Sequence, residues 1–387
     1  MNRREVKRAP VLRFKGFTND WEQRKFENLV SRLSKTSNNE SLPNVTYDDI
    51  KSRENSLNKD ITELIHGKKG IHFNKDDILF GKLRPYLGNI LLARFNGIAV
   101  GDFWVLSPKD NNISSFLFDL IQTSKYKYIS NLSSGSKMPR SDWNLVSKAS
   151  FWVPIQQEQN KIGKIFQLID NLVSLQQRKL RLLKLLKKAT QQNIFASTEC
   201  LPKLKYRNLT GKWQLYRLKD VAKITMGQSP NSKNYTQNPI DHILVQGNAD
   251  IRNGYVFPRI WTTEITKVAN KGDIILCVRA PAGDVGRTKF NVVIGRGVAA
   301  IKGNDFIFQQ LQFMKSSGYW KKYISGSTFE SINSNDIKNA KIFCPSQLEQ
   351  KNISSLLDDI DTSIQIQQKN ILDFKYIKQF LLQNMFI

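Results

Sequence analysis

Apolar residues recur at three- and four-residue steps along two long stretches of the chain, residues 156–196 and 347–387. The apolar positions are Ile162, Ile165, Ile169, Leu172, Leu183 and Leu186 in the first stretch, and Ile353, Leu356, Ile360, Ile364, Ile371, Phe374, Ile377 and Leu381 in the second. This spacing is typical of coiled-coil helices. Neither stretch contains proline, so the pattern predicts two uninterrupted helices, each about 60 Å long. An ordinary core helix also buries an apolar stripe, but most globular helices have only about 8–20 residues.

The sequence before each of these stretches has the mixed pattern of a globular domain. Short runs rich in β-branched and aromatic residues, bounded by Gly, Asn and Asp, predict strands at residues 73–80, 98–106 and 292–301. Residues 113–128 and 304–323 are expected to be helical. We therefore expect domains of the α+β class.

The chain contains an internal repeat. Residues 154–159 (PIQQEQ), at the start of the first predicted helix, resemble residues 345–350 (PSQLEQ), which lie 191 positions later. The beginnings of the globular parts also match, because residues 21–30 (WEQRKFENLV) resemble residues 213–222 (WQLYRLKDVA). The chain is therefore interpreted as two units, each made of a globular domain and a long helix.

This repeat predicts the domain organisation. The first globular domain is expected at residues 1–155, the first helix at 156–196, the second globular domain at 197–346 and the second helix at 347–387. A single chain with this order can pack its helices antiparallel. The expected fold is α+β, with two globular domains, each followed by a long helix, and with the helices forming an antiparallel coiled coil that has pseudo-two-fold symmetry.

The charge of the chain points to a polyanionic partner. Its 387 residues include 59 Lys and Arg against 33 Asp and Glu, which gives a formal net charge of +26. The first predicted helix carries +6 and the second −1, so +21 lies in the globular domains and linkers. Because phosphate neutralisation by Lys and Arg is the main electrostatic source of affinity for nucleic acids, we expect the globular domains to bind DNA. Solubility alone requires a net charge of only about 2–8 for a small domain.

The sequence argues against a membrane protein, a disulfide framework and a zinc site. Residues 1–10 are charged, which predicts no secretory signal, and no run of about 18 apolar residues occurs. The three cysteines, Cys200, Cys277 and Cys344, are widely spaced, and the chain has only three histidines. A soluble protein of a reducing compartment, without a bound metal, is expected.

The motifs of DNA-modifying enzymes are missing. The sequence has no Pro-Pro dipeptide, which the Asn/Asp-Pro-Pro-aromatic motif of adenine methyltransferases requires, and no GxxxxGK[ST] phosphate-binding loop. Residues 284–287 and 295–297 are glycine-rich, but without a GxGxxG pattern they are interpreted as turns. We therefore expect no catalytic centre and no cofactor in this chain.

Three segments resemble a known family. Residues 10–17 (PVLRFKGF), followed by Trp21, are similar to the start of Type I restriction–modification specificity subunits from low-GC Gram-positive bacteria. Residues 77–88 (DILFGKLRPYLG) are similar to a recurrent segment of their target-recognition domains, and the start of each long helix resembles their repeated regions. The resemblance covers essentially the whole chain, although residues 209–213 replace the fuller Phe-x-Gly-Phe element at the start of the second domain.

The resemblance implies a function. Each globular domain is expected to be a target-recognition domain that reads one half of a bipartite DNA site, with the coiled coil setting the spacer. The expected partners are double-stranded DNA, two methyltransferase subunits and the restriction/translocase subunits. S-adenosylmethionine, ATP and Mg are expected on those partner subunits, in a bacterial cytoplasmic complex that associates with the nucleoid through DNA.

Candidate DNA contacts are polar and basic side chains in loops, because these can reach phosphates or base edges. They are Lys68, Lys69, Lys82, Arg84, Ser136, Lys137 and Arg140 in the first domain, and Gln246, Asn248, Arg279, Arg287, Arg296, Ser327 and Thr328 in the second. The Ser-Gly-Ser loops at residues 134–137 and 325–328 match at the offset of 191, so both are expected to face DNA. Any single candidate could instead be a solvated surface charge or a turn residue.

Two other functional classes compete with this interpretation. A basic coiled-coil scaffold or a non-specific architectural DNA-binding protein would show no bipartite consensus. A stand-alone nuclease or methyltransferase would be active as a purified chain with Mg²⁺ or S-adenosylmethionine, which the missing motifs disfavour.

Overall fold

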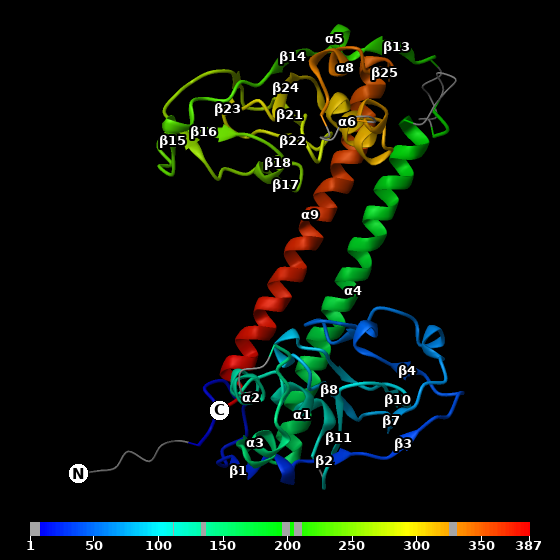
Figure 1. The fold of residues 1–387 in the computed structure, drawn as a ribbon, viewed down its shortest axis with the longest axis vertical. Helices are drawn as coiled ribbons and strands as arrows, with labels where there is room; N and C mark the ends of the chain where they lie inside the picture. Colours follow the sequence, from blue (N-terminus) through cyan, green and yellow to red (C-terminus); the bar gives the residue numbers. More distant parts are fainter. Residues whose placement is uncertain (1–7, 111, 133–136, 196–201, 205–210, 325–330) are drawn as a thin grey trace, which may run out of the picture. The chain divides into compact units, whose positions relative to one another are not determined.

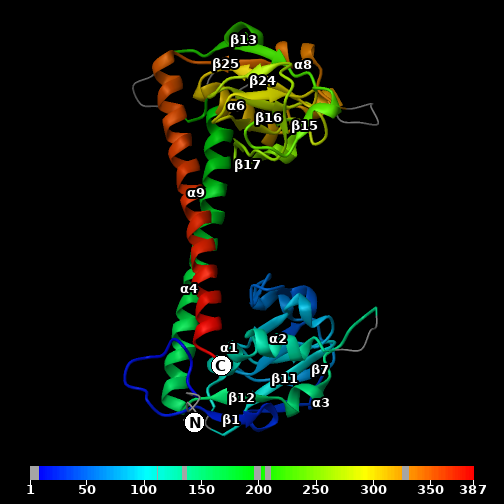
Figure 2. The same ribbon diagram turned by 90° about the vertical axis from the view of Figure 1, so that its left-hand side faces the viewer.

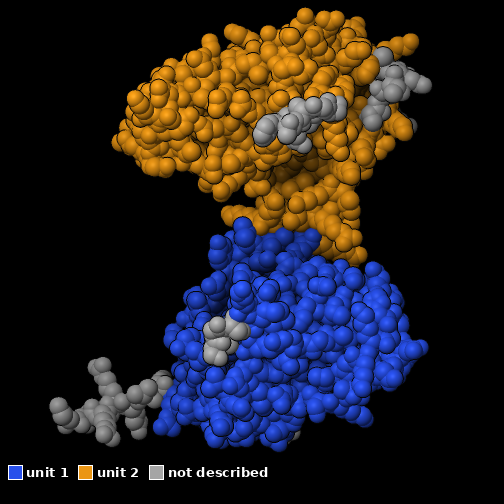
Figure 3. Space-filling view, in the orientation of Figure 1, with its two compact units in different colours: residues 1–177, 370–387 blue, residues 178–369 orange. Residues whose placement is uncertain are grey.

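The computed structural model describes residues 8–110, 112–132, 137–195, 202–204, 211–324 and 331–387. The chain forms two compact units, which Figure 3 shows in different colours. Unit 1 contains residues 1–177 and 370–387, and unit 2 contains residues 178–369. The division cuts both long helices, α4 (Gln156–Phe195) and α9 (Gln347–Asn384), so each unit contains one globular domain and a part of each helix.

Unit 1 combines two four-stranded sheets with three short helices (Figure 1). Its strands are β1 (Glu22–Lys25), β2 (Val30–Leu33), β3 (Thr36–Ser37), β4 (Asn44–Val45), β5 (Ile50–Lys51), β6 (Ser56–Leu57), β7 (Gly70–Phe73), β8 (Ile78–Gly81), β9 (Ile90–Leu92), β10 (Gly97–Ala99), β11 (Phe103–Pro108) and β12 (Ser150–Val153). Its short helices are α1 (Ser114–Leu120), α2 (Ser124–Ser130) and α3 (Trp143–Lys148). The sheet orders are β2-β11-β8-β9 and β3-β7-β10-β4, with β1-β12 and β5-β6 as separate pairs.

The β2-β11-β8-β9 sheet of unit 1 packs against a core on each of its faces. Strand β8 contributes to both cores, because successive side chains of a strand point to opposite sides of the sheet. Ile78 and Phe80 of β8 belong to a core that also contains residues of α1, α2 and α4. Leu79, between them, packs with Val45 and Phe73 in a second core formed with the other sheet. The sheet therefore separates a helical layer from a second sheet layer.

Unit 2 repeats this layered arrangement with larger sheets. Its strands are β13 (Gln214–Arg217), β14 (Lys223–Met226), β15 (Tyr235–Thr236), β16 (His242–Val245), β17 (Ile251–Arg252), β18 (Tyr255–Val256), β19 (Trp261–Thr262), β20 (Val268–Ala269), β21 (Ile274–Cys277), β22 (Val285–Arg287), β23 (Val292–Ile294), β24 (Val298–Lys302) and β25 (Lys341–Cys344). Its helices are α5 (Leu218–Val221), α6 (Asp305–Ser316), α7 (Lys321–Ile324) and α8 (Ser334–Lys338). The sheet orders are β14-β24-β21-β22-β18-β17 and β15-β19-β16-β23-β20, with β13-β25 as a pair.

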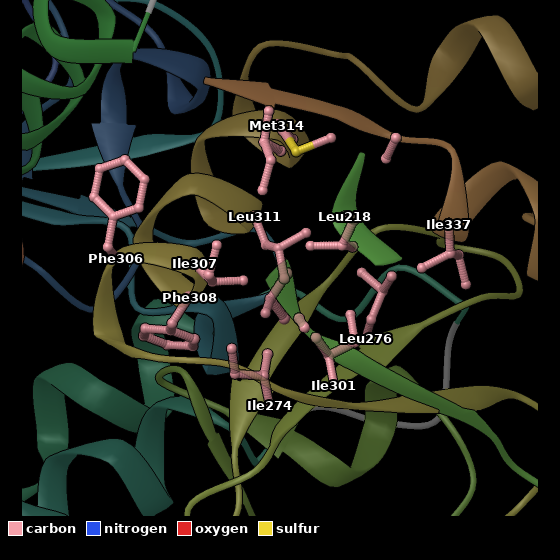
Figure 4. Packing of buried hydrophobic residues seen from close by; sticks show 14 of the residues in the cluster. Leu218, Ile274, Leu276, Ile301, Phe306, Ile307, Phe308, Leu311, Met314 and Ile337 are labelled. Carbon is pink, nitrogen blue, oxygen red and sulfur yellow. The ribbon is translucent and has the colours of Figure 1, made fainter. Parts of the chain in front are cut away.

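The same alternation organises the core of unit 2. Ile274 and Leu276 of β21 pack with Phe306 and Leu311 of α6 (Figure 4). Ile275, between them, packs in the second core of this unit. Each globular domain is thus of the α+β class.

Helices α4 and α9 pair antiparallel in unit 1. Phe166 of α4 packs against Phe386, with ring centroids 6.0 Å apart, whereas Asp170, further along α4, pairs with Lys378, further back along α9. In both views the C-terminal part of α9 lies beside the N-terminal part of α4 within this unit (Figure 1, Figure 2).

The two helices also pair antiparallel in unit 2. Lys187 of α4 pairs with Asp361 of α9. Ile194, further along α4, shares a core with Ile353, which lies further back along α9. Both units therefore contain the same kind of helix pair.

The packed positions differ partly from the expected stripe. Leu186 and Ile377 were expected to be packed, but they are 52% and 47% exposed. The neighbouring Lys187 and Lys378 have side chains that are only 16% and 14% exposed. The prediction followed apolar residues, whereas the packed positions follow a regular alternation of four- and three-residue steps that includes these lysines.

Close approach explains the single glycine of α4. A Cβ atom at Gly163 would lie 2.1 Å from Ser115 Oγ and 3.0 Å from the backbone nitrogen of Phe116. Because glycine in a helix interior costs about 0.5–1 kcal/mol relative to alanine, its presence here is best explained by the contact between α4 and the start of α1.

The far end of each long helix closes the core of a globular domain. In unit 1, Phe386 stacks on Phe116 at 5.4 Å and meets the edge of Trp21 at 6.4 Å. In unit 2, Phe195 at the end of α4 meets Phe306 and Phe313 at 5.6 and 5.5 Å. Aromatic contacts of this kind contribute about 0.5–1.5 kcal/mol beyond burial.

Several expected elements are interrupted by turns. The helix expected at 113–128 is two helices, because Thr123 caps α2 by accepting a hydrogen bond from the Tyr126 N–H. The helix expected at 304–323 ends at Ser316, shortly before Gly318, whose φ of 76° is left-handed. The strands expected at 73–80, 98–106 and 292–301 are each two strands separated by a tight turn.

Candidate nucleic-acid interface

Two cations predicted to contact DNA share one carboxylate in unit 1. Lys82 Nζ lies 3.5 Å from Asp102 Oδ1, and Arg140 Nη2 lies 3.1 Å from Asp102 Oδ2. The three side chains are between 30% and 54% exposed. At such exposure an ion pair contributes little stability, so its main effect is to orient two cations beside each other at the surface.

Backbone contacts bring two further predicted residues to the same place. Leu83 and Arg140 form an isolated antiparallel bridge, and the Arg84 N–H donates to the Pro139 carbonyl at 2.7 Å. Lys137, three residues before Arg140, is exposed. We call the surface formed by Lys82, Arg84, Lys137 and Arg140 the basic edge.

Tyr47 supports the basic edge from behind. Its hydroxyl donates to the Asp102 carbonyl at 2.6 Å and accepts from the Leu83 N–H at 3.1 Å, while its ring stacks on Phe103 with centroids 4.7 Å apart. Burial raises the pKa of Tyr47 to about 12, against the opposing effect of the Leu83 N–H. The phenol therefore stays neutral and fixes the segment that carries Asp102.

Other predicted residues of the first domain lie elsewhere or cannot be placed. Lys68 and Lys69 are exposed in the loop before β7, where both backbone groups of Lys68 bond to the side chain of Asn44 at 2.9 and 3.1 Å. This loop belongs to the second sheet and not to the segments that form the basic edge. Ser136 lies outside the described residues.

Unit 2 repeats the backbone arrangement of the basic edge. Arg279 forms an isolated antiparallel bridge with Ser331. Ser331 follows Arg140 at the repeat offset of 191. Arg279 lies two residues after the end of β21, as Leu83 lies two residues after the end of β8. Arg279 is exposed. Ser327 and Thr328, which precede this bridge, lie outside the described residues.

Three further predicted residues of unit 2 lie near one another. The segment at Gly297 approaches Gln246 so closely that a Cβ atom at Gly297 would lie 2.0 Å from the Gln246 carbonyl oxygen. Arg296, next to it, is exposed, and Asn248 begins a short 3-10 helix two residues after Gln246. The amide of Gln246 donates to Tyr235 Oη at 2.7 Å. The surface therefore combines one cation with polar groups suited to base edges.

Arg287 is not brought together with these residues. Its guanidinium pairs with Asp305 at 2.5 Å and lies over the ring of Phe308, 4.8 Å from the centroid. It also lines a cavity of about 480 Å³ beside Lys187 and Asp361 of the helix pair. The structure thus gives Arg287 a packing environment, and its contact with DNA stays a prediction.

Two buried aspartates that fix loops, Asp49 in unit 1 and Asp250 in unit 2, were not predicted from the sequence. Asp49 Oδ2 accepts bonds from the Thr46 N–H at 2.9 Å and from the Thr46 hydroxyl at 2.6 Å, and its Oδ1 accepts from Lys59 at 2.9 Å. Burial raises the pKa of this carboxyl, but the bonds from Thr46 and Lys59 outweigh that effect, so the pKa lies below its ordinary value.

The corresponding carboxylate of unit 2 is Asp250. Its Oδ2 accepts from the Gln246 N–H at 2.8 Å, and its Oδ1 accepts from Arg259 Nε at 2.9 Å. The available signal was a repeated Asp-Ile-Lys/Arg tripeptide, residues 49–51 and 250–252. Asp250 thus fixes the loop that carries Gln246 and Asn248.

A buried carboxyl lies beside the helix pair of unit 1. Asp119 of α1 is 2% exposed, and its Oδ2 has no hydrogen-bond partner among the described residues. Burial raises the pKa of Asp119 well above its ordinary value; Lys378 opposes this shift and Asp170 adds to it. Gln122 Nε2 donates to Asp119 Oδ1 at 3.4 Å. The carboxyl is therefore protonated in the folded protein over part of the pH range in which an unfolded chain would ionise it.

Replacing Asp119 by asparagine is expected to raise the melting temperature at pH 8 but not at pH 4. A raised folded-state pKa favours folding only while the group stays protonated, and this contribution is lost as pH rises above the unfolded value of about 4. Scanning calorimetry of both proteins from pH 4 to 8 measures the effect. A difference in melting temperature that is independent of pH would contradict the assignment of a protonated Asp119.

Other kinds of site are not found in the part of the chain that the structure describes. Within it, no group of three or more His, Cys, Asp and Glu side chains is arranged to bind a metal ion. Among its helices, none is long and apolar enough to cross a membrane.

Comparison with known proteins identifies the family. The family model for the Type I restriction modification DNA specificity domain matches twice, at residues 18–185 and 210–373. The chain belongs to the Type I specificity subunits. Specificity subunits are non-catalytic components of Type I restriction–modification complexes, and the two matches correspond to the two halves of the internal repeat.

Individual relatives agree with this family. The chain is 30% identical over 316 residues to the putative type I restriction enzyme MjaX specificity subunit of Methanocaldococcus jannaschii, covering 77% of this chain and 72% of that protein. Its fold resembles the crystal structure of the S subunit of the Type I restriction–modification system of M. genitalium, with a TM-score of 0.67, 14% identity and coverage of 98% and 99%. It also resembles, with a TM-score of 0.60 and 22% identity, a chain from a study of complex assembly and conformational transition of the type I R-M system, covering 94% of this chain and 96% of that one.

Proposed function

We propose that this specificity subunit reads a bipartite DNA site, with one globular domain for each half and with α4 and α9 setting the spacer between them. The observation that carries the proposal is the repetition of one loop arrangement on two domains of the same fold. In each, an isolated bridge places cations beside the core sheet: Leu83 with Arg140 in unit 1, and Arg279 with Ser331 in unit 2. The residues around the bridges differ, which suits the reading of two different half-sites.

Charge supports double-stranded DNA as the ligand. The globular domains and linkers carry +21 of the net charge of +26. Phosphate contacts position a protein on DNA, whereas amides and arginines read base edges in the major groove. The basic edge of unit 1 would supply mainly the first kind of contact. Gln246 and Asn248 of unit 2 would supply the second.

Exposed apolar side chains on the long helices support protein partners. In unit 1, Leu168 and Leu175 of α4 and Tyr376 and Phe380 of α9 are 56–68% exposed. In unit 2 the exposed large apolar side chains of the two helices are Leu182, Leu185, Leu186, Leu348 and Ile366. Apolar surface of this extent on a helix favours docking of another protein.

Because both units carry such a surface, we propose that two methyltransferase subunits dock, one on each. Restriction/translocase subunits would complete the complex. S-adenosylmethionine, ATP and Mg would then be bound by the partner subunits, and the complex would act on DNA in the bacterial cytoplasm.

Co-expression with the neighbouring methyltransferase gene in a host without other adenine methylation tests the proposal. Sequencing that detects N6-methyladenine should reveal a gapped, two-part motif that disappears when this chain is omitted. Absence of new methylation, despite a stable complex and an active methyltransferase, would instead favour a scaffold or a non-specific DNA-binding protein.

A further inference from the structure

In each unit an ion pair joins α4 and α9, and these two pairs lie at equivalent positions of the repeat. In unit 1, Lys378 Nζ lies 2.6 and 2.8 Å from the carboxylate oxygens of Asp170. In unit 2, Lys187 Nζ lies 2.6 and 2.7 Å from those of Asp361. Asp361 follows Asp170, and Lys378 follows Lys187, at the repeat offset of 191. Both helices therefore carry an aspartate followed 17 residues later by a lysine.

The lysines occupy positions at which coiled coils normally place apolar residues. In α9, Ile371, Phe374, Lys378 and Leu381 follow one another at steps of three, four and three residues, and all are buried or half-buried. In α4, Lys187 follows Leu183 by four residues in the same pattern. A lysine at such a position costs stability but can specify the register of a coiled coil.

In unit 2 the ion pair is also connected to the globular domain. Gln312 Oε1 of α6 accepts a bond from Lys187 Nζ at 2.7 Å, and Gln309 Nε2 donates to Asp361 Oδ2 at 3.1 Å. The lysine and the aspartate thus bind three helices together. Removing either partner would leave a largely desolvated charge without compensation, which is strongly destabilising.

In unit 1 the corresponding helix is α1. Asp119 of α1 and Gln122, two residues after the end of this helix, line a cavity of about 660 Å³ together with Asp170 and Lys378. The ion pair of this unit therefore also lies where the long helices meet the first helix of the globular domain.

We propose that these two ion pairs fix the register and the orientation of α4 against α9. Asp170, Lys187, Asp361 and Lys378 are then positioning residues that set the spacer between the half-sites. The spacer part of this inference rests on the proposed function, whereas the register part does not.

A slipped register would lose both ion pairs. Moving α9 by one heptad keeps the apolar positions in phase, so apolar packing alone discriminates poorly against it. In the slipped pairings, Lys378 would face Gly163 or Gln177 in place of Asp170, and Lys187 would face Ser354 or Gln368 in place of Asp361. Each slip leaves two half-buried lysines without a carboxylate.

A parallel arrangement of the two repeats would place like charges together. If α4 and α9 were aligned in the same direction at the repeat offset, Asp170 would face Asp361 and Lys187 would face Lys378. Like charges at close range are repulsive, and most strongly where water is excluded. The Asp-to-Lys spacing thus permits the antiparallel pairing and rejects the parallel one, although both helices have the same apolar pattern.

Two double variants with identical composition test the proposal. The first, Lys187→Asp with Asp361→Lys, exchanges the charges within one pair and keeps opposite charges across the helices. The second, Lys187→Asp with Asp170→Lys, exchanges the charges along α4 and makes both pairs like-charged. The amide of Gln312 can rotate to donate to the carboxylate introduced at position 187, since it offers a donor and an acceptor. Gln309 keeps its shorter bond to Asp358, at 2.7 Å.

Both variants are co-expressed with the methyltransferase partner, and the purified complexes are compared with the wild type. The pair exchange should keep the melting temperature within about 3 °C and leave the methylated motif unchanged. The exchange along α4 should lower the melting temperature by about 10 °C or more, or abolish folding, and should remove the motif or change its spacer.

Equal behaviour of the two variants, whether both are tolerated or both fail, would overturn the proposal. If the wild-type complex methylates no gapped motif, the proposed function fails, but the difference in melting temperature still tests the register. If the wild-type motif is present, and if both variants keep its spacer and the melting temperature of the wild-type complex, the ion pairs have no positioning role.

Discussion

Insertion of one heptad into each long helix, after Gln177 in α4 and after Asn370 in α9, is expected to lengthen the recognised spacer by about three base pairs. Seven residues add about 10.5 Å of helix, and successive base pairs are about 3.4 Å apart. The insertion point in α4 lies at the boundary between the units and that in α9 lies one residue beyond it, so both ion pairs and both cores stay intact within their own units. The two half-sites themselves should remain unchanged.

A heptad is the appropriate length because it preserves the packing phase of the two helices. The control is the same heptad in α4 alone, which has no complement in α9 and should lower both the melting temperature and the extent of methylation. Methylation sequencing of the co-expressed complexes reads the spacer directly. Recovery of the original spacer from the double insertion would contradict the role of the helices.

Replacing Arg84, Lys137 and Arg140 of the basic edge with alanine is expected to weaken DNA binding by about 100-fold at about 0.15 M salt. Each phosphate contact contributes about 0.9 to the slope of log affinity against log salt, so the slope should fall by about 3 units. Lys82 remains to compensate Asp102 in this variant, so folding should be retained. Titration of a labelled target duplex at several salt concentrations measures both quantities.

A triple alanine variant of Lys25, Lys75 and Lys148 provides the matched control. These exposed lysines belong to the same unit but not to the basic edge, and their removal lowers the net charge by the same amount. If both triple variants lose affinity equally, the contribution is one of overall charge, and the basic edge is not the DNA contact. If neither loses affinity, the candidate surface of unit 1 is wrong.

The long helices were predictable because their signal extends over many turns. A periodic pattern that continues for roughly 40 residues, and that occurs twice, outweighs local exceptions. The exact packed positions were not predictable in the same way. Leu186 and Ile377 looked like packed residues, whereas Lys187 and Lys378 are the half-buried ones. The packing of such a lysine can be predicted only if its carboxylate partner is known. Here that partner lies on the other helix.

The strands illustrate a second limit. The apolar run at 73–80 contains a turn at which Asp76 adopts a φ of 71°, so β7 and β8 belong to different sheets. A single Asn or Asp tolerates both extended and left-handed backbone, so it does not show by itself where a strand ends. The residues that pack on the two faces of the sheet determine where the strand ends, and they come from distant parts of the chain.

The candidate interface shows the same dependence on distant residues. Lys82 and Arg84 could be chosen from their loop, but their proximity to Arg140 depends on a bridge between segments 57 residues apart. Arg287 looked similar in sequence, yet it packs on Phe308 and pairs with Asp305. Residue type and loop context select candidates, whereas the tertiary fold decides which of them share a surface.

The contact of Phe386 with Trp21 and Phe116 has a consequence for synthesis of the chain. Unit 2 is continuous from residue 178 to residue 369, so all of its residues have been made before α9 is complete. Unit 1 must wait for residues 370–387, because its core contains Leu381, Met385 and Phe386. Domains generally fold as they emerge from the ribosome, N-terminal part first. Here the order is reversed for the final step, because the domain translated first is the last to close. Until then its apolar core is incomplete, and transiently exposed apolar surface is prone to aggregation.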